Sequence, residues 1–478
     1  MNQKLTPLFS TLQQFQLNQP VSFHVPGHKN GEIFPSFAKD YYSSLLRLDV
    51  TELPGLDDLH APEGAIANAE QLAGDYFQAD HTFFLVGGST TGNLAMVLAT
   101  CTANDTIIVQ RNCHKSIMNA LELSGAKPVF IAPEYNEIVD RYTSPSISTL
   151  QEALALYPQA KAVVLTYPDY FGKTFNLKKM IDLIHSYHIP VLIDEAHGVH
   201  FSLGTPFPES AIALGADIVV QSAHKMAPAL TMSAYLHLNS AIVSKHRVAH
   251  FLQIIQSSSP SYPIMASLDI ARAFLADFKQ VAIKRVLASV DKVKTIFDDS
   301  SYWRIVPSDD PLKITLQMNE GIAANEVAKH FEFEQIYPEL VTHNQLLFIH
   351  GLAPFPWEKR LKKAVKSVKD QLKNSAKHDT IKVQSFFPKR IQELALSYPL
   401  MQNLHTVYMP FNEAVGHVAA EAVIPYPPGI ALILKGEKIT TLHIEAINQL
   451  RKQGIRMQQR HTDGIHVFTG IKEGEEDT

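Results

Sequence analysis

The chain has 478 residues, of which 46% are hydrophobic and 19% are charged, a composition typical of a globular protein with roughly two to four domains. Its net charge is −5 without a broad basic excess, so nucleic acid is not an expected partner. The N-terminus lacks a signal peptide pattern, no apolar run approaches the ~20 residues of a membrane span, and the two cysteines cannot form a disulfide framework, which together predict a cytoplasmic protein without a membrane partner.

From residue 82 onward, short β-branched runs alternate with amphipathic segments of helical length. The strand-like runs are 82–86, 106–110, 128–131, 162–166, 190–194 and 217–221. The helical segments between them lie near 91–103, 115–125, 147–157, 177–188 and 207–215. Strands that alternate with helices predict an α/β fold with a parallel sheet covered by helices on both faces.

The pattern divides the chain into four parts. They are an N-terminal arm, a large α/β domain, a smaller α+β domain and a C-terminal α+β domain, expected at 1–20, 21–290, 291–375 and 376–478. The large domain is expected to close with one long helix near 266–287. In the smaller domain, the Lys-rich stretch 358–373 has apolar residues at helical spacing, which predicts a helix with a solvated basic face.

Three groups of polar residues follow strand-like runs. Residues 87–93 read Gly-Gly-Ser-Thr-Thr-Gly-Asn before a helix, which suits a phosphate site at a helix N-terminus or an ordinary capped loop. Asp194 ends the second group, and Ser222 to Lys225 form the third. Because ligands bind at the carboxyl ends of strands in open α/β sheets, we expect the three groups to lie together.

Two other kinds of site fit these residues poorly. A nucleoside triphosphatase needs a phosphate loop with an earlier glycine, and before Gly172-Lys-Thr174 that position is occupied by Tyr167. The histidine pairs 24/28 and 197/200 are interrupted by glycine-containing turns and lack a third ligand, so no metal is expected.

Together, a phosphate anchor, a strand-end carboxylate and a strand-end lysine fit pyridoxal 5′-phosphate. The cofactor needs an anion site for its phosphate, a carboxylate beside its pyridine nitrogen and an amine that forms a Schiff base with its aldehyde. Residues 87–93, Asp194 and Lys225 supply these in chain order.

Beyond these residues, the chain resembles the bacterial ornithine/lysine/arginine decarboxylases over nearly its whole length. The shared motifs are Phe23-His-Val-Pro-Gly-His-Lys-Asn-Gly31, Leu56-Asp-Asp-Leu-His60, Arg111-Asn-Cys-His-Lys-Ser116, Asp194-Glu-Ala-His-Gly198, Ser222-Ala-His-Lys225, Ser257-Ser-Ser-Pro-Ser-Tyr262 and Tyr426-Pro-Pro-Gly429. The resemblance implies pyridoxal-phosphate fold type I, the aspartate-aminotransferase fold with a parallel-rich sheet, in a short form without a wing domain.

The resemblance also implies roles for matching positions. Lys225, Asp194, His114 and His197 are the expected catalytic residues, with Lys225 bound to the cofactor aldehyde and His114 stacked on its ring; without the resemblance, His114 is as well explained as a helix cap. Cofactor-binding positions are Ser89, Thr90, His114, Asp194, Ala196, Ser222, His224, Lys225 and Ser258. Ser258 would reach a neighbouring subunit's phosphate, which implies a homodimer or higher homo-oligomer with shared active sites. Glu421 and Tyr426 are expected near the substrate.

The implied activity is decarboxylation of arginine, lysine or ornithine to agmatine or a diamine, a carbon–carbon lyase reaction of polyamine metabolism. Other pyridoxal-phosphate reactions on this fold, such as transamination or aldol cleavage, and a non-catalytic cofactor-binding regulator stay as alternatives. Met232, Ala431 and Asp169 depart from the family pattern. The sequence does not choose among the three substrates, because the candidate side-chain carboxylates Asp169, Glu339 and Glu421 are far apart in the chain.

Overall fold

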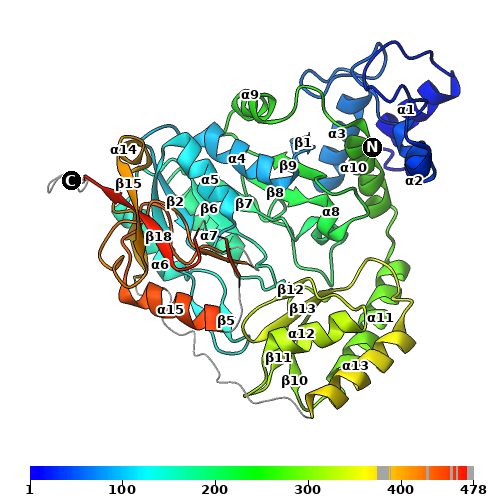
Figure 1. Ribbon diagram of the computed structural model, residues 1–478. Coiled ribbons are helices and arrows are strands. Elements are labelled where there is room, and N and C mark those ends of the chain that lie inside the picture. The colour runs from blue at the N-terminus through cyan, green and yellow to red at the C-terminus, as the bar shows by residue number, and fades with distance from the viewer. Residues whose placement is uncertain (374–386, 388, 427–429, 453–455, 459–460, 471–478) are drawn as a thin grey trace. The chain divides into compact units, whose positions relative to one another are not determined.

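The computed structural model describes residues 1–373, 387, 389–426, 430–452, 456–458 and 461–470 (Figure 1). They form two compact units, one of 1–100 with 176–279 and one of 101–175 with 280–478. Each unit is described by itself below. The division of the chain into four domains stays a prediction.

The first unit contains four strands in the order β1 (His81–Leu85), β9 (Ala234–Leu238), β8 (Ile218–Ser222) and β7 (Val191–Asp194). β7 and β8 are parallel, as predicted, whereas β9 is antiparallel to both β8 and β1. β9 was not predicted, and it is fully buried. β9 follows β8 closely in the chain and lies between β8 and β1 in the sheet. The expectation that the strand at 82–86 belongs to a parallel sheet is therefore wrong for its pairing with β9.

Helices surround these strands. They are α1 (Pro7–Leu17), α2 (Ser36–Leu46), α3 (Ala65–Phe77), α4 (Gly88–Thr100), α7 (Leu177–His185), the 3-10 helix η1 (Val199–Leu203), α8 (Ala223–Met226), α9 (Lys245–Ile255) and α10 (Tyr262–Ala276). α4 lies against β8 and β9 (Figure 1). Its Gly92 permits this contact, since a Cβ there would lie 2.6 Å from the Val220 side chain and 2.8 Å from that of Leu85.

Among its described residues, the second unit contains strands of two larger sheets and three two-stranded sheets. In the first, β6 (Val163–Thr166), β2 (Thr106–Gln110) and β3 (Lys127–Ile131) are parallel, as predicted, and β14 (Ile391–Glu393) is antiparallel to β3. Its helices α5 (Lys115–Ser124) and α6 (Ile147–Leu156) match predicted segments. The short strands are β4 (Tyr135–Asn136), β5 (Arg141–Tyr142), β15 (His405–Pro410), β16 (Ile424–Tyr426), β17 (Arg456–Gln458) and β18 (Gly464–Thr469), near α14 (Tyr398–Met401) and α15 (Thr441–Lys452).

The other sheet of the second unit is antiparallel, in the order β10 (Trp303–Val306), β11 (Lys313–Met318), β13 (Gln345–Ile349) and β12 (Leu340–Val341). Helices α11 (Gln280–Asp298), α12 (Ala324–Phe333) and α13 (Glu358–Leu372) accompany it (Figure 1). α13 is the predicted basic helix, with Leu361, Val365 and Val368 on its buried face.

Two predicted helices differ from the structure. Residues 211–215 form turns rather than a helix, and the Ala211 amide donates to the Glu195 carboxylate at 2.7 Å instead of to a backbone carbonyl. The predicted long helix near 266–287 is two helices, α10 and α11, separated at 277–279. No helix among the described residues combines the length and the apolar character needed to cross a bilayer.

A buried ion pair fixes the N-terminal arm of the first unit. Asp269 and Arg272, one turn apart on α10, have fully buried side chains with 2.7 Å between Oδ1 and Nη2. Asp269 accepts from the Leu8 amide at 3.0 Å, at the start of α1, and Arg272 donates to the carbonyls of Gln3 and Leu5. The helix α1 therefore begins where its free amides meet a carboxylate.

In the second unit, a similar pair holds a C-terminal segment. Arg111, directly after β2, lies 2.9 Å from the Glu437 carboxylate, and both side chains are almost fully buried. Arg111 also donates to the carbonyl of Ala431 at 2.7 Å. The family-motif arginine thus joins β2 to the segment around Ala431, one of the positions that depart from the family pattern.

Asp57, in the second shared motif, organises the approach to α3. Its two carboxylate oxygens accept from five backbone amides at 2.8–3.2 Å, those of Asp58, Glu63, Gly64, Ile66 and Ala67. Partial burial raises the pKa of Asp57, but the amide hydrogen bonds lower it more, so the pKa lies below its usual value. The ionised carboxylate therefore stabilises the fold above the unfolded-state pKa, and this contribution is lost as the pH falls through the folded-state pKa.

We expect Asp57→Asn to lower the free energy of unfolding by about 1–2 kcal/mol at pH 7, because an amide has a single acceptor oxygen for these donors. The difference should shrink as the pH falls through the folded-state pKa of Asp57, because the wild-type carboxyl then becomes protonated as well. Urea unfolding at several pH values measures it. Asp40→Asn, on an exposed position of α2 without a hydrogen bond among the described residues, is the control. A loss that stays equal across this pH range would contradict this account.

Candidate functional site

The ends of β7 and β8 and the start of α4 bring three predicted groups together in the first unit. The Ser222 hydroxyl, at the end of β8, donates to the Ser89 hydroxyl oxygen at 2.8 Å. Asn93, on α4, donates to Oδ2 of Asp194 at 2.8 Å. The expectation that the loop 87–93, Asp194 and Ser222 lie close together is therefore confirmed by these contacts.

Asp194 is held as a buried carboxylate. Its residue is 3% exposed, and it accepts from Asn93 and from the Ala196 amide, which lies 3.1 Å from Oδ1. It has no ion-pair partner among the described residues. Burying a charge is unfavourable unless an opposite charge or further hydrogen bonds compensate for it. The carboxylate is thus suited to receive a cationic N–H group.

Lys225 lies beside a histidine. It belongs to the short helix α8, which follows β8 directly, and its Nζ is 3.0 Å from Nε2 of His197. His197 is 5% exposed and follows Asp194 by three residues. A lysine amine in contact with an imidazole can exchange a proton with it. The pair brings together two of the predicted catalytic residues.

The predicted phosphate-binding residues lie around the first turn of α4. Ser89 is partly exposed and Thr90 is exposed there. The Gly88 amide donates to the carbonyl of Met232 at 2.8 Å, and both residues have left-handed backbones, with φ of 76° and 77°. His224 lies on α8, with Nδ1 3.0 Å from the Ser233 carbonyl. Met232 therefore contributes its backbone to the α4 turn, while its side chain is 49% exposed.

A buried polar chain lies beside these residues and was not predicted. The Thr82 hydroxyl contacts Nδ1 of His237 at 2.9 Å, Nε2 of His237 contacts Oε1 of Gln221 at 3.1 Å, and Nε2 of Gln221 donates to the Glu195 side chain. Burial raises the pKa of Glu195 to about 8, against the lowering effect of the hydrogen bonds from Gln221 and from the Ala211 amide. Burial lowers the pKa of His237 to about 3, so this imidazole is neutral, with one nitrogen donating and the other accepting.

This hydrogen-bonded chain of four side chains adjoins the predicted site residues in sequence. Glu195 separates Asp194 from the turn that carries His197, and Gln221 directly precedes Ser222. A Cβ on Gly198 would lie 2.5 Å from Cγ of Glu195, so the turn is packed against that side chain. The four side chains therefore fix the two strand ends on which Asp194, His197 and Lys225 depend.

The remaining predicted residues are described within their own units. His114, in the second unit, caps α5 by accepting from the Ser116 amide at 3.3 Å, and it is exposed. Glu421, also in the second unit, accepts from the amide and from Nδ1 of His466 at 2.9 and 3.0 Å. Tyr426 ends β16, whereas 427–429 lie outside the described residues. Ser258, in the first unit, is exposed. The roles expected of these residues stay predictions.

Like Glu421, the other two candidate side-chain carboxylates have partners within the protein. Asp169 accepts from the Arg141 guanidinium at 3.3 Å and from the amides of its own turn. Glu339 accepts from the Tyr170 hydroxyl at 2.7 Å. Asp169, a departure from the family pattern, is therefore part of a local ion pair that stabilises its turn.

Sequence reasoning missed Asn93, Glu195 and Gln221 as residues that support the site. Asn93 closes the quoted 87–93 segment, but its partner is separated from it by 101 positions. Gln221 is a polar residue in a run that is otherwise apolar, and Glu195 is a second acid directly after Asp194. A polar residue inside a buried strand is a signal that could have identified them, because such groups need partners.

Comparison with known families and proteins gives consistent matches. The family model "Orn/Lys/Arg decarboxylase, major domain" matches residues 6–315, and the "C-terminal domain" model of the same family matches residues 379–458. The uncharacterized protein YaaO of Bacillus subtilis is 42% identical over 454 residues, which cover 93% of this chain and 94% of YaaO. The arginine decarboxylase of the same organism is 34% identical, with 99% of each chain covered.

A solved structure has the same fold. The lysine decarboxylase LdcF of Francisella novicida superimposes with a TM-score of 0.80 at 20% identity, over 97% of this chain and 81% of LdcF. The fold class expected from the sequence, an α/β enzyme with a parallel-rich sheet of the pyridoxal-phosphate type, is therefore confirmed.

We expect Gln221→Leu to lower the free energy of unfolding by about 2–4 kcal/mol, because it removes one buried hydrogen-bond partner from Glu195 and another from His237. Thr82→Val, which removes only the terminal hydroxyl of the chain, should lower it by about 1 kcal/mol. Urea unfolding of both variants, with the cofactor bound, measures the difference. If the two variants lost the same amount, the four side chains would not act as one connected chain.

Proposed function

The chain belongs to the family of Orn/Lys/Arg decarboxylases, and we propose that it removes the α-carboxylate of a basic amino acid, with arginine as the first candidate. The enzyme is a pyridoxal-phosphate-dependent carbon–carbon lyase. The observation that carries the proposal is the buried Asp194 carboxylate on one strand end with Lys225 following the next strand. Fold alone does not fix a reaction, so the proposal depends on these residues.

The residues of the first unit fit the cofactor. Asp194 is a buried carboxylate without a cationic partner among the described residues, which suits a protonated pyridine nitrogen. Lys225 supplies the amine for the aldehyde. Ser89 accepts from Ser222, so its own hydroxyl hydrogen is available to a phosphate oxygen at the α4 N-terminus. When bound, the cofactor provides a ring that delocalises the electrons released with carbon dioxide.

The protein's own groups then have separable tasks. Asp194 holds the proton on the ring nitrogen through its charge, and Asn93 orients that carboxylate. His197 exchanges a proton with Nζ of Lys225 across their 3.0 Å contact. One of these two groups delivers the proton that replaces the carboxylate at Cα. His114 is proposed to stack on the ring, as the family resemblance implies.

Arginine is placed first because the arginine decarboxylase of Bacillus subtilis matches this chain from end to end. All three candidate carboxylates have partners within the protein, and Glu421, which contacts His466, is the one that we propose for the substrate's cationic side chain, with Tyr426 nearby in sequence. Agmatine would be the product. We assign the enzyme to polyamine biosynthesis in the cytoplasm.

We further propose a homodimer, or a higher homo-oligomer, with shared active sites. Support comes from a set of exposed apolar side chains in 17–45, which exceeds what a free surface ordinarily displays. They are Leu17, Val21, Phe23, Ile33, Phe37 and Tyr41, each 65–94% exposed. Ser258 is also exposed, in keeping with a partner's phosphate as its target. A second copy of this chain is the proposed partner of these side chains.

Carbon dioxide release from arginine, lysine and ornithine, assayed side by side, tests the function. We expect release from arginine at a kcat/KM at least about tenfold above the other two, a difference of about 1.4 kcal/mol in transition-state binding. Lys225→Ala should abolish carbon dioxide release. After borohydride reduction, this variant should also retain no covalently bound cofactor. If none of the three basic amino acids released carbon dioxide, the proposal would be contradicted. Amino transfer to a keto acid, or aldol cleavage, would indicate the other enzymatic reactions, and cofactor binding without turnover a regulator.

Sedimentation equilibrium tests the assembly. We expect the wild type to be at least dimeric, and Phe37→Ser with Tyr41→Ser to raise the dissociation constant at least about tenfold, since each change removes buried apolar area from the interface. Phe333→Ser removes an equally exposed phenylalanine of the second unit, 77% exposed, and should leave the assembly unchanged. A fully active monomeric wild type would overturn this part of the proposal.

A further inference from the structure

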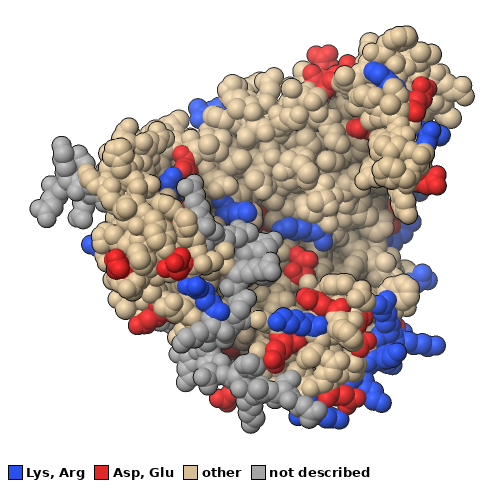
Figure 2. Space-filling model, viewed as in Figure 1, with Lys and Arg blue, Asp and Glu red and all other residues tan. Residues whose placement is uncertain are grey.

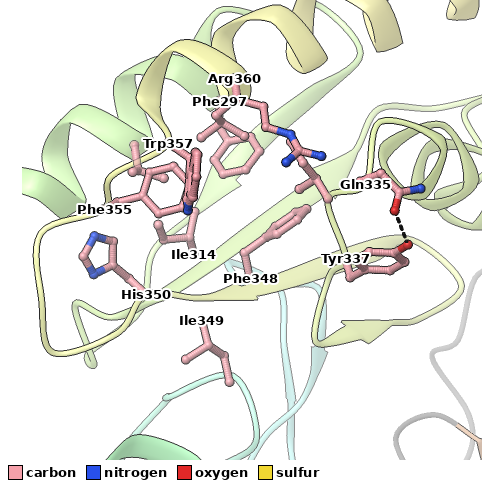
Figure 3. Close-up of a pocket in the computed structure, with 13 residues that line it drawn as sticks. Phe297, Ile314, Gln335, Tyr337, Phe348, Ile349, His350, Phe355, Trp357 and Arg360 are labelled. Atoms are coloured by element: carbon pink, nitrogen blue, oxygen red, sulfur yellow. Dashed lines mark hydrogen bonds between the residues drawn. The ribbon is translucent and has the colours of Figure 1, made fainter. Parts of the chain in front are cut away.

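The second unit contains a pocket in its antiparallel sheet region. It has a volume of about 320 Å³ and lies between β11, β13, α11 and the start of α13. Its walls are largely aromatic and aliphatic, including Phe297, Ile314, Phe348 and Trp357 (Figure 3). Pockets of this size with mostly apolar walls and few polar groups are typical of small-molecule sites. None of the lining residues is among those assigned to cofactor or substrate.

The polar groups of the pocket are nearly all engaged within the protein. His350 contacts the Gly351 carbonyl at 2.7 Å and the Ser289 hydroxyl at 3.1 Å. The Tyr337 hydroxyl donates to the Gln335 carbonyl oxygen at 3.1 Å (Figure 3). These groups therefore have little capacity left for a ligand.

Apart from the Trp357 indole, which has no side-chain hydrogen bond among the described residues, Arg360 is the exception. Among the described residues its guanidinium makes one hydrogen bond, to the Glu334 carbonyl at 3.3 Å, and no ion pair. A guanidinium carries five N–H donors, so most of them are available. In Figure 3 the Arg360 guanidinium points toward the space beside the Phe348 ring. Arg360 is therefore the charged group that is available to a ligand in the pocket.

The charge around the mouth favours an anion. No Asp or Glu lines the pocket. Arg360 belongs to α13, which also carries Lys359, Lys362, Lys363, Lys366 and Lys369. Figure 2 shows Lys and Arg side chains gathered over the region of α11 and α13 in Figure 1. Burial lowers the pKa of His350, more than its hydrogen bond to Gly351 raises it, so this imidazole adds no positive charge at neutral pH.

We propose that this pocket binds a small carboxylate with an aromatic body, its ring held among Phe297, Phe348 and Trp357 and its carboxylate paired with Arg360. The pairing is a charge-assisted, bidentate contact of the kind that guanidinium groups make with carboxylates. A basic amino acid is excluded, because its cationic side chain would meet Arg360 without a compensating acid. The pocket is thus a second site, distinct in chemistry from the decarboxylation substrate.

The test uses 3-phenylpropionate and its neutral isostere 3-phenylpropanamide with the full-length, cofactor-loaded enzyme. Isothermal titration is expected to show that the carboxylate binds at least about tenfold more tightly than the amide. Trp357, 60% exposed, is one of two tryptophans and the other, Trp303, is 2% exposed, so the carboxylate should change the long-wavelength emission. Arginine in excess should leave both signals unchanged.

Two variants on the same helix separate the pocket cation from the general charge of α13. Arg360→Gln should remove the preference for the carboxylate, whereas Lys363→Gln, an equal charge change at an exposed position outside the pocket, should keep it. Trp357→Phe should abolish the emission change but keep binding. Equal binding of acid and amide, equal effects of the two charge variants, or no binding up to about 10 mM, the weakest affinity a site of this size is expected to give, would overturn the proposal.

Discussion

Asp194 is a carboxylate almost fully removed from water, and the surrounding parts of the first unit supply what its burial requires. Asn93 and the Ala196 amide each give it a hydrogen bond, which ties α4 and the turn after β7 to the same two oxygen atoms. A buried charge without a counter-charge is unfavourable by several kcal/mol. Under the proposed function, a cofactor with a cationic N–H group would supply that counter-charge, and its binding would stabilise the native state of this unit.

Both units place a buried polar contact at a strand end next to a family motif. In the first, the chain from Thr82 to Glu195 crosses from β1 to the turn after β7. In the second, the Arg111–Glu437 pair follows β2 and precedes His114 by a few residues. Such contacts are satisfied in one geometry and poorly in others, so they reduce the number of ways in which the neighbouring loops can pack.

The sequence predicted the six strand-like runs and the proximity of the polar groups that follow them in the first unit, because short apolar strands and the polar residues after them are local signals. It missed β9, since one more buried apolar run after Lys225 gives no indication of an antiparallel return. It placed a helix at 207–215 where the Ala211 amide is bound by Glu195. The contacts of Asn93, Gln221 and Arg111 connect residues far apart in sequence or in different elements. Their pairing is determined by the three-dimensional fold, which local patterns do not contain.

The Asp269–Arg272 pair, which binds the N-terminal arm, affects the order in which the nascent chain can fold on the ribosome. The Leu8 amide has its acceptor on Asp269, 261 positions later in the chain. At roughly 5–20 residues per second, α1 is synthesised on the order of 10 to 50 s before that acceptor exists. For that interval, α1, which carries the buried Leu8 and Leu12, can pack against α3 but lacks α10, the other helix that it contacts in the finished protein. The first helix to be made thus completes its packing only after α10, and until then one side of it stays open to the cell's chaperones.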